Sequence, residues 1–503
     1  MHVDKFYKDS FILTLSNMVT GIIAFVFSLI LSRELGAEGL GLYGLVMPIY
    51  GLLLCITSDG IITAISKITA VYFGRKDIKN LNKTIGTIFG FVILWAAGTA
   101  FLVLICNKGI AAHIVRDARS AKAIMMLSPA LLFVPVSAVV KGFFYGQGIY
   151  KVTSTVDIGE KLLRVVILLS AISLLHPESV DETVAAAYFA LAAGELLSMS
   201  LLLICYKVRK RRISGILNAG CRVKSRIQLA FDVFVISIPL SLNGVCSSIL
   251  STASTLVLPR RLVAAGFSHS DALSLIGRFN GMALNISGLP YIIIGSMLTV
   301  LVPELSLNIS RKDYWSAEER IAQVLKISCA IGISTSVVCL VLPDVLGQLF
   351  YRRNDLADMI RFSVPINLIS FVASPTFGML NALGKQNILL KNSIIVSLEE
   401  LSLIFVLAGI PALNIYGYGL AAILTSFTAL VINIREIKKI CEFKIELQDV
   451  ITLILTGIVA YLASGIAAGL MGGAAPALLA AAVVVVSFGS VLGLNSLAIK
   501  LKA

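Results

Sequence analysis

Long apolar stretches dominate the chain, and the polar segments between them are short. A membrane-spanning helix needs about 20 consecutive, mainly apolar residues. The hydrophobic pattern meets this requirement fourteen times. The first stretch is too long for the apolar part of a cleaved signal peptide, so we expect it to remain as a helix. The predicted spans are 10–32, 42–65, 84–106, 123–146, 152–175, 184–206, 230–257, 284–307, 322–343, 361–383, 388–409, 417–434, 449–471 and 475–498.

The composition supports a membrane protein and narrows its class. Of the 503 residues, 57% are hydrophobic and only 14% are charged, whereas about a quarter of the residues in soluble proteins are charged. This is too little charge to cover a water-facing surface of that size. The net charge of +14 does not indicate nucleic-acid binding, because Lys and Arg accumulate in the cytoplasmic loops of membrane proteins. We therefore expect one multi-pass protein of the cell membrane.

The distribution of basic residues predicts the orientation of the spans. If the N-terminus is cytoplasmic, 31 of the 42 Lys and Arg residues fall in or beside inside segments and 11 outside. The segment 207–226 is the clearest case, since it contains eight basic residues and no acidic one. The positive-inside rule then predicts that both termini are cytoplasmic and that the number of spans is even.

Weak sequence repeats indicate that the chain has two related halves. Arg75-Lys76-Asp77 matches Arg311-Lys312-Asp313, and the series Pro135, Gly146 and Glu160 matches Pro375, Gly384 and Glu399, at offsets of 236 to 240 residues. With an even number of spans per half, such repeats are parallel. The predicted fold is all-α, with two six-helix pseudo-repeats around a central cavity and two further helices. The predicted domains are 1–206, a basic cytoplasmic linker 207–229, a second lobe 230–438, and 439–503 with two extra spans.

No motif in the sequence predicts an enzyme or a resident cofactor. Gly39, Gly41 and Gly44 fit G-x-G-x-x-G, but they join two predicted spans and so predict a turn rather than a dinucleotide site. The chain lacks a phosphate-binding G-x-x-x-x-G-K-[ST] loop. Its eight cysteines form no C-x-x-C pair and its four histidines are scattered, which argues against a metal site.

Ionisable residues within predicted spans are the candidates for function. Placing one at the centre of the bilayer costs about 2.5–3.5 kcal/mol on insertion scales, so such residues usually face a cavity or a partner. Glu160 and Arg164 are four residues apart and share a helix face, which leaves a local ion pair and a ligand-binding role both open. Arg33 and Lys67 are interfacial anchors or binding residues. Ser16, Asn17, Thr20, Ser28 and Ser32 fit either helix packing or a hydrated groove.

Several of these segments together resemble a known superfamily. They are Asn17-Met18-Val19-Thr20, the run from Arg33-Glu34-Leu35-Gly36 to Gly41-Leu42-Tyr43, Ala64-Ile65-Ser66-Lys67 and Glu160-Lys161-Leu162-Leu163-Arg164. With these motifs and its predicted spans, nearly the whole chain resembles the multidrug/oligosaccharidyl-lipid/polysaccharide (MOP) flippase superfamily. Within it, the chain is most similar to the stage V sporulation protein B group of spore-forming bacteria.

This resemblance implies a flippase that moves an undecaprenyl-diphosphate-linked saccharide or peptidoglycan precursor to the outer leaflet by alternating access, for spore-cortex or cell-wall synthesis. Its partners would be that lipid-linked substrate, membrane lipids and a proton or sodium coupling ion. Relatives that flip peptidoglycan precursors place arginines in the first span, where this chain has Gly21 and Ser28. Phosphate recognition would then rest on Arg33, Lys67, Lys161, Arg164 or Arg278, and the cavity or coupling residues would be Asp59, Glu160, Glu195, Glu399 and Glu400.

Two other functions remain open from the sequence. One is a cation-coupled multidrug exporter of the same superfamily, in which Asp59 and Glu399 are the ion sites. The other is a non-transporting scaffold that recruits wall-synthesis enzymes through its basic loops. Because no basic residue follows Glu399 until Arg435, we expect the head-group phosphate to lie nearer the first half.

Overall fold

The computed structural model describes residues 2–177, 179–213, 224–441, 447–471 and 475–502. All regular secondary structure in these ranges is helical, which confirms the predicted all-α class. Contacts between residues divide the chain into two compact units, Met1–Leu256 and Val257–Ala503. We describe each unit separately.

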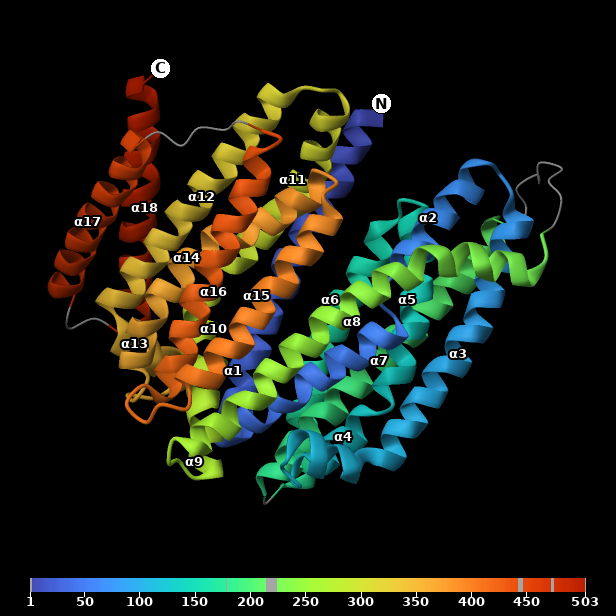
Figure 1. Ribbon diagram of the computed structural model, residues 1–503, viewed down its shortest axis with the longest axis horizontal. Helices are drawn as coiled ribbons and strands as arrows, with labels where there is room; N and C mark the ends of the chain where they lie inside the picture. Colours follow the sequence, from blue (N-terminus) through green and yellow to red (C-terminus); the bar gives the residue numbers. More distant parts are fainter. Residues whose placement is uncertain (1, 178, 214–223, 442–446, 472–474, 503) are drawn as a thin grey trace. The chain divides into compact units, whose positions relative to one another are not determined.

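The first unit is a bundle of long helices (Figure 1). Its core is formed by α2, α3, α5 and α7, whose aliphatic and aromatic side chains include the fully buried Ile65, Ile85, Phe143 and Phe144. The elements are α1 (His2–Thr57), α2 (Ile61–Gly74), α3 (Ile78–Gly109), the π-helix η1 (Ile110–Val115), α4 (Ser120–Leu127), α5 (Ala130–Gly146), α6 (Tyr150–Leu175), α7 (Val180–Ile213) and most of α8 (Arg226–Ala264).

The link between the first two predicted spans is a kink rather than a loop. Gly36 has φ 67° and ψ −172°, a conformation that a residue with a side chain rarely adopts, and α1 is helical on both sides of it. The turn predicted over Gly39 to Gly44 is therefore wrong, because these glycines lie within the helix that resumes after Gly36. Gly39 instead allows close packing, since a Cβ there would lie 3.4 Å from the Val180 side chain of α7.

The second predicted span is interrupted near its end. Ser58, Asp59 and Gly60 form a turn between α1 and α2, and Gly60 has φ 77°. Helix α2 then packs closely on α5 through Gly142, where an added Cβ would lie 2.9 Å from the backbone oxygen of Ile62. Gly142 and Gly146 form a G-x-x-x-G pair, the spacing of small residues that lets membrane helices approach closely.

The second unit begins within α8 and contains the remaining helices. Its main core lies between α11, α12, α14 and α16. The last two helices pack on α12, where Ala460 and Val491 contact Ala330 and Val337. The elements are α9 (His269–Ile276), η2 (Gly277–Ala283), α10 (Leu284–Gly288), α11 (Tyr291–Ser310), α12 (Tyr314–Val341), α13 (Pro343–Tyr351), α14 (Ala357–Ala382), α15 (Gln386–Leu407), α16 (Asn414–Lys438), α17 (Leu447–Leu470) and α18 (Pro476–Lys502).

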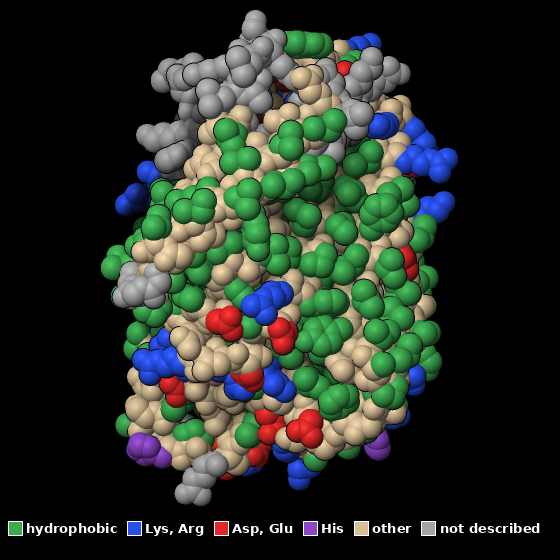
Figure 2. Space-filling model, turned by 90° about the vertical axis from the view of Figure 1, so that its left-hand side faces the viewer, with side chains coloured by type: hydrophobic (Ala, Val, Ile, Leu, Met, Phe, Trp, Pro, Cys, Tyr) green, Lys and Arg blue, Asp and Glu red, His purple; other side chains and the backbone are tan. Residues whose placement is uncertain are grey.

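The helices identify a multi-pass membrane protein. Within the described residues, ten helical segments are long and apolar enough to cross a membrane, or eleven if the bent pair His269–Gly288 and Tyr291–Leu298 counts as one span. Figure 2 shows a broad band of hydrophobic side chains on one face, with many of the charged side chains gathered below it. Helices α6 and α15 also coincide with predicted spans, but each contains at least three charged residues. The count of fourteen remains a prediction.

The repeated turns have matching backbone geometry. Lys76 and Lys312 adopt φ 57° and 60°, and the next residue, Asp77 or Asp313, accepts a 3.1 Å hydrogen bond from a backbone N–H of the following helix. The glycine pairing needs a correction. Gly384, with φ 72°, matches Gly148, with φ 70°, whereas the predicted partner Gly146 is helical and packs on α2.

The predicted domain boundaries differ from the contact units. The contacts divide the chain after Leu256, within α8, whereas the predicted lobes are separated by the linker 207–229. Residues 214–223 of that linker lie outside the described residues. The four predicted domain ranges and the cytoplasmic location of the termini stay predictions.

Candidate functional site

A small polar cavity lies among the helices of the first unit. Its volume is about 200 Å³. It is bounded by α1, α5, α6 and α7, and most of its lining side chains carry a hydroxyl, an amide or a charge. The lining residues are Ser16, Asn17, Thr20, Lys141, Tyr145, Ser154, Asp157, Glu160, Lys161, Glu195 and Ser198.

An arginine between two carboxylates lies beside this cavity. Arg164 Nε donates to Glu160 Oε1 at 2.7 Å, and its Nη2 is 3.2 Å from Glu195 Oε1 on α7. The side chains of Arg164, Glu160 and Glu195 are 13%, 6% and 18% exposed, so the cluster is largely shielded from solvent. The local ion pair between Glu160 and Arg164 thus exists, and Arg164 also reaches a third charge on the next helix. A ligand-binding role for these residues stays a prediction.

A glycine on α7 makes room for this cluster. A Cβ added at Gly194 would lie 2.9 Å from Glu160 Oε1 and 3.6 Å from the Arg164 Cβ. A larger residue would therefore displace the carboxylate from the guanidinium. Gly194 is one residue before Glu195, so the same turn of α7 provides both the space and the second carboxylate.

Two lysines also face the cavity, and each lies beside one carboxylate. Lys141 Nζ is 2.8 Å from Asp157 Oδ1, and Lys161 Nζ is 3.7 Å from Glu160 Oε2. Lys161 is 34% exposed and Lys141 is 22% exposed, more than Arg164. Since Arg164 is held by two carboxylates, the lysine ammonium groups are the cations better placed to meet an anion.

The structure brings together four of the predicted site residues. Glu160, Lys161 and Glu195 line the cavity, and Arg164 bonds to two of them. Ser16, Asn17 and Thr20, the polar positions predicted for a packing surface or hydrated groove, line it as well.

The other predicted residues of the first unit lie elsewhere. Arg33 is exposed on α1, three residues before the kink at Gly36, and Lys67 lines a separate pocket between α2 and α8. Asp59 lies at the break between α1 and α2, where its backbone oxygen accepts a hydrogen bond from Ser241. The Asp59 carboxylate packs directly against Gly244 of α8. These residues do not line the cavity of Lys141 and Lys161.

In the second unit, the predicted residues have different environments. Glu399 Oε1 accepts a 3.0 Å hydrogen bond from Thr428 Oγ1 on α16, and among the described residues Glu399 forms no ion pair. Its neighbour Glu400 is half-buried on α15. Arg278 lies in η2 and pairs at 3.0 Å with Asp355, in the turn between α13 and α14.

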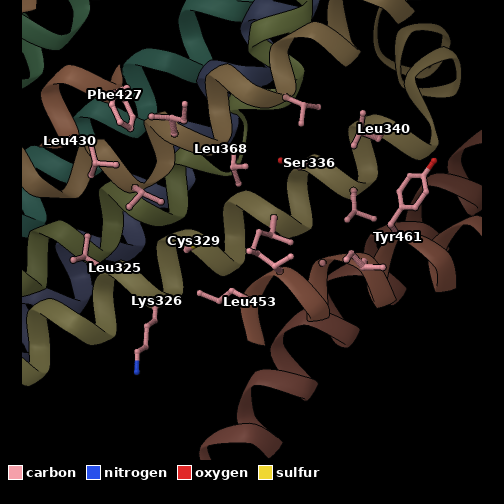
Figure 3. Close-up of a pocket in the computed structure, with 18 of the residues that line it drawn as sticks. Leu325, Lys326, Cys329, Ser336, Leu340, Leu368, Phe427, Leu430, Leu453 and Tyr461 are labelled. Atoms are coloured by element: carbon pink, nitrogen blue, oxygen red, sulfur yellow. The ribbon is translucent and has the colours of Figure 1, made fainter. Parts of the chain in front are cut away.

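The second unit also contains an apolar groove between α12, α14, α16 and α17 (Figure 3). Its volume is about 750 Å³, and its lining is almost entirely aliphatic and aromatic. Lys326 extends from one end of the groove and Tyr461 lies toward the other, with Leu325, Leu368 and Leu453 among the residues near it.

The prediction omitted Lys141 and Asp157 from the site, although both fall within predicted spans. Lys141 was counted with the cytoplasmic basic residues. The signal that could have identified them is the high cost of an ionisable residue within an apolar segment. Their pairing is not visible in the sequence, because they are sixteen positions apart and lie on different helices, α5 and α6. No group of three or more metal-ligating side chains occurs in the described ranges.

Comparison with known proteins assigns the family. Residues 6–309 match the model of the polysaccharide biosynthesis protein family. The chain is 26% identical to stage V sporulation protein B of Bacillus subtilis (strain 168) over 458 residues, 89% of this chain and 86% of that protein. It is 22% identical to lipid II flippase MurJ of the same organism over 413 residues, 76% of this chain and 73% of that protein.

Solved structures show the same fold. Lipid II flippase MurJ in an inward closed conformation matches with a TM-score of 0.69 and 12% identity, over 97% of this chain and 98% of that one. An inward-facing multidrug resistance MATE family transporter of the MOP superfamily matches with a TM-score of 0.66 and 15% identity, over 85% of this chain and 94% of that one. The chain thus belongs to the polysaccharide biosynthesis protein family, within the MOP flippase superfamily and near stage V sporulation protein B.

Proposed function

We propose that this protein is a flippase that moves an undecaprenyl-diphosphate-linked saccharide or peptidoglycan precursor to the outer leaflet, for spore-cortex or cell-wall synthesis. The observation that carries the proposal is the polar cavity of the first unit, with Lys141 and Lys161 among its hydroxyl groups. The two named relatives, a sporulation protein and a lipid II flippase, support the substrate class.

In this proposal, Lys141 and Lys161 contact the head-group phosphates and Arg164 neutralises two carboxylates. Without Arg164, Glu160 and Glu195 would repel a diphosphate. With it, the charges of the three bases and of Asp157, Glu160 and Glu195 balance, so an entering anion meets no excess of negative charge. Charge-assisted hydrogen bonds to phosphate are about twice as strong as neutral ones.

The cavity is small compared with a lipid-linked saccharide, so we propose that it holds the phosphates and nearby sugar atoms rather than the whole molecule. The isoprenoid tail is apolar and would remain against apolar surface. Arg33 and Arg278, which the resemblance assigned to phosphate binding, stay predictions.

A cation-coupled multidrug exporter is the second candidate. It is favoured by the placement of the Asp59 carboxylate at a broken helix, beside Gly244, and by the likeness to a MATE transporter. Breaks in membrane helices commonly mark ion and substrate sites. In this alternative, Asp59 would exchange a proton or sodium ion.

A transport assay separates the two candidates. The purified chain is reconstituted in proteoliposomes with a fluorescent undecaprenyl-diphosphate-linked saccharide, and its exposure in the opposite leaflet is followed with and without proton, sodium and electrical gradients. The proposed function predicts flipping that empty liposomes lack. Absence of flipping together with gradient-driven efflux of a cationic dye would instead support the exporter.

A further inference from the structure

The pocket between α2 and α8 is not used by the proposed transport mechanism. It has a volume of about 390 Å³ and combines basic groups with an apolar rim. Its lining residues are Lys67, Ile68, Val71, Tyr72, Arg75, Lys224, Phe231, Asp232, Val235 and Ile236. Three of these side chains are cationic and one is anionic, which leaves an excess of two positive charges.

Two of the cations have no competing partner in the part of the chain that the structure describes. Lys67 and Arg75 are exposed, and among the described residues neither side chain forms a hydrogen bond or an ion pair. Lys67 and Val71 of α2 and its C-cap residue Arg75 follow a four-residue spacing and so lie along one side of this helix. Eight residues separate the two cations, which is about 12 Å along a helix axis. The face therefore has a cation at each end and an apolar centre.

The third cation is held in place by its surroundings. Lys224 Nζ is 2.7 Å from Asp232 Oδ2 and lies 6.0 Å from the centre of the Tyr72 ring. Its backbone N–H donates to Asn80 Oδ1 at 3.0 Å, and Lys83 Nζ donates to its carbonyl oxygen at 2.7 Å. The hydrogen bond with Asp232 is the main cause that raises the pKa of Lys224. This corner of the pocket is thus formed without a ligand.

The remaining wall is suited to hydrocarbon. Phe231 and Val235 lie one turn apart on α8 and are 64% and 56% exposed, and Val71 of α2 is 43% exposed. Exposed apolar side chains on membrane helices normally contact lipid tails. A small soluble anion would satisfy Lys67 and Arg75 but would leave this rim uncovered. An amphiphile with an anionic head group would pair with the two cations and also cover the apolar rim.

We propose that this pocket binds one anionic phospholipid, with the side chains of Lys67 and Arg75 reaching its anionic head group and its acyl chains along Phe231 and Val235. A diacyl phosphatidylglycerol has the required chemistry. The inference concerns a lipid that stays bound rather than one that is transported, and it does not depend on the proposed flipping activity. It also gives Lys67 a role apart from the substrate cavity.

The test measures lipid binding to the purified full chain by native mass spectrometry. Phosphatidylglycerol and phosphatidylcholine of equal chain length compete for binding to each of three proteins. These are the wild type, the pocket variant Lys67→Gln/Arg75→Gln and the matched control Arg311→Gln/Lys385→Gln. The control removes the same charge at exposed positions outside this pocket. Each Lys or Arg near an anionic lipid contributes about fivefold in affinity, so the pocket variant should lower the preference for phosphatidylglycerol by roughly 25-fold.

A second variant tests the contribution of the apolar rim, and a soluble competitor tests whether a head group alone can bind. Val235→Asp retains both cations but places a carboxylate in the rim, and it should also weaken phosphatidylglycerol binding. Glycerol 3-phosphate at millimolar concentration should not displace the lipid. Equal binding of the two lipids to the wild type, an equal loss in the matched control, or displacement by glycerol 3-phosphate would each overturn the proposal.

Discussion

The two units place a glutamate on corresponding helices but surround it differently. In the first unit, Glu160 of α6 binds Arg164, which also reaches Glu195 of α7. In the second unit, Glu399 of α15 accepts a hydrogen bond from Thr428 of α16. The helix pair and the acidic position are thus common to both units, but among the described residues Glu160 forms an ion pair and Glu399 does not.

A second contrast occurs in short turns near the ends of the spans. In the first unit, Arg119 pairs with two acids, Asp117 at 2.9 Å and Glu38 at 2.7 Å. In the second unit, the acid Asp355 pairs instead with two arginines, Arg353 at 2.7 Å and Arg278 at 3.0 Å. Arg116 and Arg352, which precede these turns, adopt φ 62° and 54°, so the backbone conformation is repeated while the ion pairs beside it differ. Between the two units, the backbone conformation of these turns is therefore more similar than the arrangement of charged side chains around them.

The largest difference is expected for Arg164→Ala. Removing one member of a buried ion pair typically costs about 3–5 kcal/mol, because the remaining charge is left unpaired. Here two carboxylates, Glu160 and Glu195, would be left together, so we expect a large fall in thermal unfolding temperature and loss of flipping. Glu400→Gln should have a much milder effect.

A rescue variant identifies the cause. Arg164→Ala combined with Glu160→Gln and Glu195→Gln should recover much of the stability without restoring flipping. If Arg164→Ala and Glu400→Gln had equally mild effects, the Arg164 cluster would be only a local ion pair with no special role in flipping. A larger effect at Glu400 would favour cation coupling.

The repeated helix caps should differ in the free energy they contribute. Asp77 is buried and also accepts a 2.7 Å hydrogen bond from Asn80 Nδ2, whereas Asp313 is exposed. Asp77→Ala should lower the free energy of unfolding by about 1–2 kcal/mol, the upper range for an N-cap. Asp313→Ala should lower it less. Denaturation of both variants in the same detergent gives the comparison, and a larger loss at Asp313 would contradict it.

The hydrogen bond at Glu399 should contribute less than the Arg164 cluster. Thr428→Val preserves the shape of the side chain and removes the hydroxyl donor. We expect a loss of about 0.5–1.5 kcal/mol, typical of a single hydrogen bond, and a flipping rate within roughly twofold of the wild type. Thermal unfolding and the flipping assay measure the two effects. A loss as large as that of Arg164→Ala would show that the units do not differ in this way.

The smallest expected effect is the pH dependence at Asp355. Hydrogen bonding from Arg353, followed by Arg278, lowers the pKa of Asp355 to about 2. A lowered pKa in the folded state stabilises the protein above the unfolded pKa, near 3.9, and this contribution is lost as the pH falls toward 2. Because the pair is exposed, solvent screening keeps the effect small.

Asp355→Asn isolates this contribution. The variant should unfold at a slightly lower temperature than the wild type at pH 6, and the difference should shrink as the pH is lowered to 2.5. If the difference in unfolding temperature between the two proteins grew on acidification, it would contradict a lowered pKa of Asp355.

Much of the fold follows from the sequence because hydrophobic length is a local property. The helical class, the repeated Arg-Lys-Asp turn and the charged face of Glu160 and Arg164 all depend on nearby residues. The kink at Gly36 does not, since a glycine there fits a loop as well as a bent helix. Contacts such as Lys141 with Asp157, or Gly194 beside Glu160, depend on how helices pack. The sequence alone therefore identified Glu160, Lys161, Arg164 and Glu195, but not the Lys141–Asp157 pair that completes the charged cavity.

The central claim is that the cavity of the first unit binds the phosphates of a lipid-linked precursor through Lys141 and Lys161. The most direct measurement is the initial flipping rate in proteoliposomes for Lys141→Gln/Lys161→Gln and for the matched control Lys385→Gln/Lys391→Gln at the start of α15, both checked for folding by thermal unfolding. Hydrogen bonds to charged groups contribute about 1.5–3 kcal/mol each, so the cavity variant should lose at least tenfold while the control stays within about twofold. Equal rates in the two folded variants would contradict the claim.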